Sequence, residues 1–129
     1  MPFIVTQSNA MALGIVDVCK TPPYSVPTPY VNLASSSVGL GFALNVTIDC
    51  SPVHTLLTTN SLTSADEVGS YGGIVSSTIK STASYVMGST SVIASCAPVA
   101  KLTSITLQNG INSPGLVAVM SQLKVMALK

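Results

Sequence analysis

Four side chains of this sequence could bind a metal ion, and they are Cys19, Cys50, His54 and Cys96. Three thiolates and one imidazole form a common tetrahedral zinc site. Such sites, however, usually place their ligands in closely spaced pairs, and here only Cys50 and His54 lie near each other in sequence. Free cysteines are most often small buried hydrophobic residues. We therefore expect no metal, and keep zinc at these four residues as the less favoured alternative.

The same residues could support nucleophilic catalysis. Cys19 or Cys50 would need His54 as a base and a carboxylate to orient it, but no recognisable active-site motif surrounds them. Asp66 and Glu67 are a second candidate, as an acid–base pair. Adjacent side chains of a strand point in opposite directions, so a turn is the better interpretation of this pair. We expect that the protein is not an enzyme.

The composition and the charge of the chain exclude several classes of protein. The chain has 129 residues, of which 47% are hydrophobic and only 7% charged, with a net charge of +1. This hydrophobicity excludes a disordered chain. Five scattered lysines and no arginine exclude a nucleic-acid-binding face. We expect one domain over residues 1–129, with a surface suited to packing against a partner.

Two apolar stretches, at residues 38–46 and 116–128, are too short for a membrane-spanning helix, which needs about 20 residues. No basic residue precedes Lys20, so the beginning of the sequence does not resemble a secretory signal. An odd number of cysteines does not suggest a disulfide framework. We expect synthesis in the cytoplasm without a signal peptide.

Strand signals dominate the sequence and predict an all-β fold. Residues 116–120 and 123–128 predict one or two closing strands, and a short helix is the weaker expectation for residues 76–84. Four prolines in residues 20–32 exclude a helix or a central strand and predict an extended path along the surface.

An internal repeat is the most informative feature. Residues 45–56 and 91–102 agree at five of twelve positions without a gap. Each copy reads as a strand, a turn and a Pro-Val step into another strand, which predicts a β-arch unit used twice. A looser third copy is expected at residues 15–19. Repeated short β units indicate a compact, wound fold.

Four motifs resemble the PAAR-like family, the tip proteins of contractile injection machines. In order, they are D-V-C-K-T-P at residues 17–22, V-P-T-P-Y-V-N at 26–32, S-A-D-E-V-G followed by G-G at 64–73, and T-L-Q-N-G at 106–110. The two Pro-Val repeats also resemble the strand–turn–proline element of this family. Together these features cover most of the chain.

The resemblance implies a small cone of short strands whose base sits, as one copy, on a trimeric β-helical spike. The implied function is to sharpen the spike for envelope puncture and to link effector cargo, with only transient membrane contact. The machine would be a type VI secretion system, an extracellular injection particle or a contractile phage tail, and the tip would be delivered outward. Thirteen residues are expected to shape this fold: Cys19, Pro27, Pro29, Cys50, Pro52, Asp66, Glu67, Gly69, Gly72, Gly73, Cys96, Pro98 and Asn109.

Many PAAR proteins hold a zinc ion near the apex through histidines and a cysteine. Cys19 matches that cysteine, but Tyr30 and Gln108 stand where the resemblance places histidines. Two other classes stay open: a stand-alone β-domain that binds a metal or ligand, and a self-assembling shell protein. Charged substitutions in residues 116–128 are expected to abolish docking on the spike if this segment belongs to the base.

Overall fold

Antiparallel β-strands make up nearly all the regular structure of this protein in a computed structural model that describes residues 2–129. The strands are β1 (Met11–Thr21), β2 (Val26–Ser35), β3 (Gly39–Leu40), β4 (Ala43–Ile48), β5 (Ser51–Val53), β6 (Thr59–Asn60), β7 (Thr63–Ser64), β8 (Ala83–Tyr85), β9 (Ile93–Ala94), β10 (Ala97–Pro98), β11 (Ile105–Gln108) and β12 (Ser113–Val119). Within residues 2–129 the one helical segment is the 3₁₀ turn η1 (Ser36–Val38). The all-β prediction is confirmed, and the helix expected at residues 76–84 is wrong.

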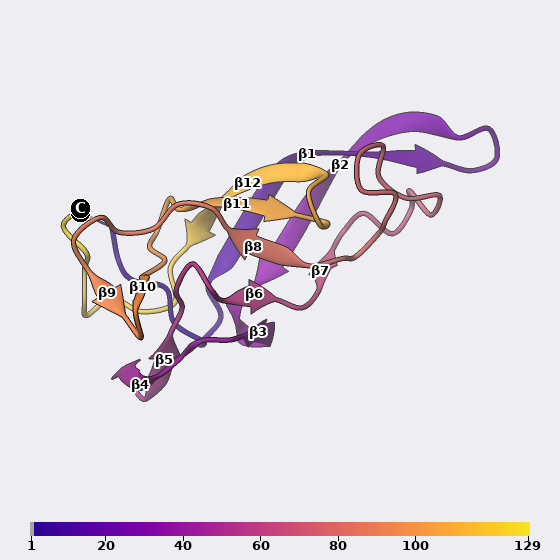
Figure 1. The fold of residues 1–129 in the computed structure, drawn as a ribbon. Coiled ribbons are helices and arrows are strands. Elements are labelled where there is room, and N and C mark those ends of the chain that lie inside the picture. The colour runs from indigo at the N-terminus through magenta and orange to yellow at the C-terminus, as the bar shows by residue number, and fades with distance from the viewer. Residues whose placement is uncertain (1) are drawn as a thin grey trace.

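Eight strands form the main sheet, in the order β3-β6-β8-β11-β12-β1-β2-β7. Two further sheets are small hairpins, β4–β5 and β9–β10. Figure 1 shows these hairpins at the broad end of the molecule, together with the C-terminus, and the turn between β1 and β2 at the opposite, narrower end. The long β1–β2 hairpin therefore links two regions with different architecture.

The proline-rich segment lies in this hairpin. Pro27 pairs with Lys20, and Pro29 pairs with Val18. On its other side, β2 pairs with β7 at Leu33 and Ala34, so the prolines occupy the half of β2 that is an edge. Proline has no N–H to donate and is tolerated there. The expected extended path along the surface is confirmed, although it forms part of an edge strand.

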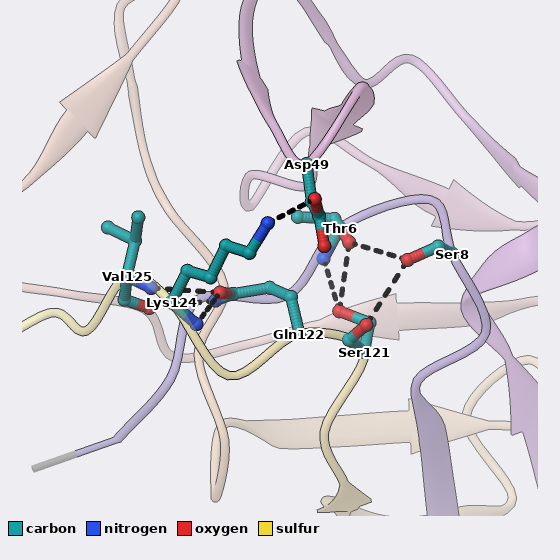
Figure 2. A network of polar contacts seen from close by, with 7 residues as sticks. All are labelled: Thr6, Ser8, Asp49, Ser121, Gln122, Lys124 and Val125. Carbon is teal, nitrogen blue, oxygen red and sulfur yellow. Dashed lines mark hydrogen bonds and ion pairs between the residues drawn. The ribbon is translucent and has the colours of Figure 1, made fainter.

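The C-terminal segment differs from its prediction. β12 forms the first expected closing strand, but residues 123–128 form no regular strand and make a single bridge, between Met126 and Phe3. The Gln122 Oε1 atom accepts hydrogen bonds from the backbone N–H groups of Lys124 at 2.7 Å and Val125 at 2.8 Å. Because these two backbone N–H groups donate to a side chain (Figure 2), they do not donate to a neighbouring strand.

Two buried clusters stabilise the fold. One lies along the main sheet and contains Val5, Tyr85 and Val117 with several alanines. The other lies at the broad end and joins the two small hairpins to the chain termini. None of the helical structure in residues 2–129 is long and apolar enough to span a membrane.

Candidate functional site

The broad end contains two equivalent hairpins, which we name the first arm (β4–β5) and the second arm (β9–β10). Each turns through two residues with positive φ: Asp49 (56°) and Cys50 (61°) in the first arm, Ser95 (49°) and Cys96 (65°) in the second. Both residues of a type I′ turn have positive φ, and this turn matches the twist of the flanking strands. The predicted repeat of residues 45–56 and 91–102 is confirmed, but each copy is a hydrogen-bonded antiparallel hairpin and not the expected β-arch.

A third arm is assembled from opposite ends of the sequence. Phe3 pairs with Met126, as Pro52 pairs with Thr47 in the first arm and Pro98 with Ile93 in the second. The third arm therefore comprises residues 2–4 and 125–127, and it holds the place of a third hairpin. The third copy expected at residues 15–19 is wrong, because Cys19 lies within β1, paired with Thr28.

Backbone hydrogen bonds join the three arms in a closed ring. The N–H of Val5 donates to the carbonyl of Ala100, that of Ala100 to His54, and that of His54 to Val5, each at 2.9 Å. A second ring lies two residues away along each chain segment. In it, Gln7 donates to Pro52 (2.9 Å), Leu56 to Pro98 (3.0 Å) and Leu102 to Phe3 (2.7 Å).

The buried residues follow the same arrangement. Ile4, Val53 and Val99 occupy equivalent positions in the three arms, as do Ala127, Ile48 and Ala94. All six are at most 9% exposed and belong to one hydrophobic cluster. Equivalent pairing, two hydrogen-bond rings and an equivalent core together give this end of the molecule a pseudo-threefold axis. We call it the three-armed end.

His54 lies at the three-armed end, but none of the cysteines lies next to it. Its ring nitrogens are bonded to the Tyr85 hydroxyl (3.0 Å) and the Gln7 side-chain oxygen (2.6 Å). The side chain is fully buried, and burial lowers its pKa to about 4. Cys50 and Cys96 are exposed in their turns, whereas Cys19 is buried in β1. The four residues of the less favoured zinc alternative, Cys19, Cys50, His54 and Cys96, are therefore not brought together.

A second cluster, centred on Asp17, brings all four sequence motifs together. The Asp17 carboxyl oxygens accept hydrogen bonds from the side-chain amides of Asn32 (2.6 Å), Asn109 (3.2 Å) and Asn112. The Cys19 thiol donates to the same carboxyl at 3.3 Å. We call these residues, with Asp66, the Asp17 cluster. It ties β1 and β2 to the turn between β11 and β12.

The side chains of Asp66 and Glu67 lie in different environments, as expected for adjacent residues whose side chains point in opposite directions. Asp66 is buried, and its carboxyl accepts from the Lys80 backbone N–H at 3.2 Å, whereas Glu67 is exposed and pairs with the Lys80 ammonium at 3.3 Å. Burial, with the nearby Asp17 charge, raises the pKa of Asp66. The two carboxyl groups do not face a common substrate position.

The glycines of the third motif pack the following loop against β1. Gly73 pairs with Cys19, and the Lys20 N–H donates to the Gly72 carbonyl at 2.8 Å. Gly72 has a φ of 87°, which L-residues with side chains rarely adopt. A Cβ atom at Gly69 would collide with the Cys19 side chain. These glycines let the loop cover the Asp17 cluster.

The environment of Cys19 opposes nucleophilic chemistry. Burial, together with the hydrogen bond to Asp17, raises its thiol pKa to about 12. A nucleophilic cysteine needs the opposite shift, because the thiolate is the reactive form. His54 makes its hydrogen bonds to Tyr85 and Gln7, so no cysteine–histidine pair forms.

The residues of the Asp17 cluster do not fit the histidine–cysteine zinc site that the family resemblance implies. The Tyr30 hydroxyl is bonded to Thr21 at 2.7 Å, and the Gln108 amide donates to Thr106 at 3.2 Å. Among residues 2–129, single ligand atoms of Asp17, Cys19 and Asp66 come within 4.8 Å of one another. However, apart from the Asp66 carboxyl, whose pKa is raised by burial and by the Asp17 charge, the groups around Asp17 present N–H and S–H donors, which are the partners of an anion.

Several residues of the Asp17 cluster have roles that were not predicted from the sequence. Asp17 and Asn32 lie within the quoted motifs but have no chemical feature that marks them as partners. Asn112 lies outside every motif, and its only signal is that it follows the Asn109-Gly110 turn. The expected site residues Pro52 and Pro98 lie in the second strands of the first and second arms.

Comparison with known proteins gives one family. Residues 10–115 match the family model described as the Toxin PAAR-like domain. No curated protein and no solved structure matches the chain. The matched region contains the Asp17 cluster and the first and second arms.

Proposed function

Because the chain belongs to the Toxin PAAR-like domain family, we propose that it caps a trimeric spike as the non-enzymatic tip of a contractile injection machine. The machine is a type VI secretion system, an extracellular injection particle or a contractile phage tail. One copy sharpens the spike for envelope puncture, can link effector cargo, and is made in the cytoplasm and delivered outward. The whole of residues 1–129 serves as one tip domain.

The pseudo-threefold axis of the three-armed end carries this proposal. A trimeric spike ends in three identical chains, and a single asymmetric chain can meet them equally only by presenting three similar surfaces. The three arms are such surfaces, because their strand pairing and hydrogen-bond rings are equivalent. The three-armed end is then the base of the tip, and the β1–β2 turn is its apex (Figure 1).

Co-expression with the candidate spike protein encoded nearby tests this proposal by native mass spectrometry. We expect a complex of three spike chains and one tip. Met126→Glu places a charge on the third arm, where Met126 is 43% exposed, and should remove the complex. Tyr24→Glu, in the β1–β2 turn at the other end, is the matched control and should leave it intact. A wild-type chain that stays a free monomer beside the folded spike would contradict the docking role.

We also propose that the Asp17 cluster holds the apical half together by hydrogen bonds without a metal. The expected result is that a chelator leaves the melting temperature unchanged, and that protein purified in zinc-containing buffer carries well under one equivalent by elemental analysis. The physical reason is that the amide and thiol donors already occupy the Asp17 oxygens. One equivalent of zinc that Cys19→Ser removes would refute this arrangement.

A further inference from the structure

Two buried carboxyl groups lie next to each other in the Asp17 cluster. Asp17 in β1 and Asp66 after β7 are both fully buried, and their oxygens come within 4.8 Å of each other. Within residues 2–129 no ammonium group forms an ion pair with either carboxyl, and the Lys80 ammonium pairs with the exposed Glu67. Two like charges so close together in the interior repel strongly, and one proton held between them removes this repulsion.

The hydrogen-bond partners of the two carboxyl groups differ. The Asp17 oxygens accept from three side-chain amides, among them that of Asn32 at 2.6 Å, and from the Cys19 thiol at 3.3 Å. The Asp66 oxygens share the backbone N–H of Lys80, at 3.2 and 3.3 Å. Donors stabilise the charged form of a carboxyl group. The negative charge therefore belongs on Asp17 and the proton on Asp66.

The other titratable groups around Asp66 leave this assignment unchanged. They are Cys19 and Lys20 of β1, Tyr30 of β2, and Glu67 and Lys80 of the segment that carries Asp66. Burial and the hydrogen bond to Asp17 raise the pKa of Cys19 to about 12, so this thiol is neutral. Glu67 and Lys80 neutralise each other. Burial, and then the Asp17 charge, raise the pKa of Asp66.

The carboxyl pair lies at the neck of the loop between β7 and β8, residues 65–82, which we call the apical loop. Asp66 near the start of the loop accepts from the N–H of Lys80 near its end. Between these residues the loop lies on β1: Gly73 pairs with Cys19, which is fully buried. Contact between Asp66 and Asp17 therefore holds the neck of the apical loop against β1.

We infer that Asp17 and Asp66 hold a single proton, which Asp66 carries and donates to Asp17, and that this proton keeps the apical loop closed on β1. The inference rests on the metal-free Asp17 cluster of the proposed function, because a metal ion bound there would displace the proton. When the proton is lost to solvent as the pH rises, two charges face each other and push the neck of the loop away from β1. The apical loop is thus a latch that alkali opens.

Infrared spectroscopy of the full chain tests where the proton lies, because a protonated carboxyl group has a carbonyl stretch that a carboxylate lacks. At about pH 6 exposed carboxyl groups are ionised, so we expect one such band from the wild type. Asp66→Asn should remove the band. Glu67→Gln, the corresponding change at the exposed neighbour, should leave it. A wild-type spectrum without the band would overturn the inference, whether or not the variants fold.

The latch itself is tested through the exposure of Cys19. In a background of Cys50→Ser and Cys96→Ser, Cys19 is the one remaining thiol, and its alkylation by iodoacetamide reports opening of the loop. Alkylation accelerates with pH in any case, because the thiolate is the reactive form. The comparison is therefore the same background with Asp66→Asn, whose neutral amide can donate to Asp17 as the protonated acid does.

We expect Cys19 with the native Asp66 to react about fivefold faster than with Asp66→Asn above the pH at which the infrared band disappears, because only the native loop opens. At about pH 6 the two rates should agree within about twofold. Equal rates on both sides of that pH would overturn the latch.

Elemental analysis of the same samples separates this inference from the metal-free cluster. One equivalent of zinc that Cys19→Ser removes would refute the metal-free cluster and the shared proton together. Protein without zinc and without the infrared band would refute the shared proton alone, and hydrogen bonds to an ionised pair would then hold the cluster.

Discussion

Replacing Asp17 with Asn is expected to lower the free energy of unfolding by about 3–5 kcal/mol, as for the loss of one partner from a buried charged network. The Asp17 carboxyl accepts from the amides of Asn32, Asn109 and Asn112. An Asn side chain would turn one acceptor oxygen into an NH₂ group and point it at these donors. Buried donors without a partner then remain, although the shape of the side chain is unchanged. Urea denaturation of the two proteins measures the difference.

The matched control is Asp49→Asn, the same chemical change in an exposed ion pair with Lys124. Ion pairs between exposed side chains contribute little to stability because solvent screens them, so this variant should unfold close to the wild-type midpoint. Equal and small effects at the two positions would show that the Asp17 cluster does not stabilise the fold. A large effect at Asp17 alone would identify the cluster as the point where β1, β2 and the β11–β12 turn are joined.

Stability is expected to fall by up to about 3 kcal/mol as the pH is lowered from about 6.5 to 4, because of His54. Burial lowers the pKa of His54 from its ordinary value of 6.5 to about 4 in the folded protein. Between these two values the unfolded chain binds a proton that the folded chain does not, so acid favours unfolding. The contribution is fully present above pH 6.5 and is lost as the pH falls.

Urea denaturation at pH 7, 6, 5 and 4 measures this dependence, and His54→Gln is the comparison. Glutamine does not titrate, so the slope over this range should decrease in the variant. Asp66 acts in the opposite direction, since its raised pKa favours the folded state in acid, and it is present in both proteins. The same pH dependence in wild type and variant would contradict the assignment to His54.

Features that are local in the chain could be predicted from the sequence alone. The first and second arms each close within a few residues through a two-residue turn, so their repeat is visible as a run of matching positions in residues 45–56 and 91–102. The prolines of β2, the glycines of the third motif and the poor helix propensity are local too. They determine an all-β chain with an extended proline segment, and their order along the chain carries the family motifs.

The third arm and the partners of each polar side chain depend on contacts between segments far apart in the chain, which the sequence does not reveal. Residues 2–4 pair with residues 125–127 across nearly the whole chain, and Phe3 stands where the other arms have proline. No local pattern encodes such a pairing. The pairing forms because it completes two hydrogen-bond rings and buries Ile4 and Ala127 with their equivalents.

Packing between distant segments also determines which side chains of the metal candidates and of the Asp17 cluster lie together. Cysteine and histidine suggested a metal centre by residue type alone, but the fold places His54 at the three-armed end, Cys50 and Cys96 in exposed turns and Cys19 beside Asp17. Asparagines, which are unremarkable in sequence, became the partners of Asp17 because β1, β2 and the β11–β12 turn converge there. A buried carboxyl needs hydrogen-bond donors, and which donors reach it depends on packing between segments far apart in the chain.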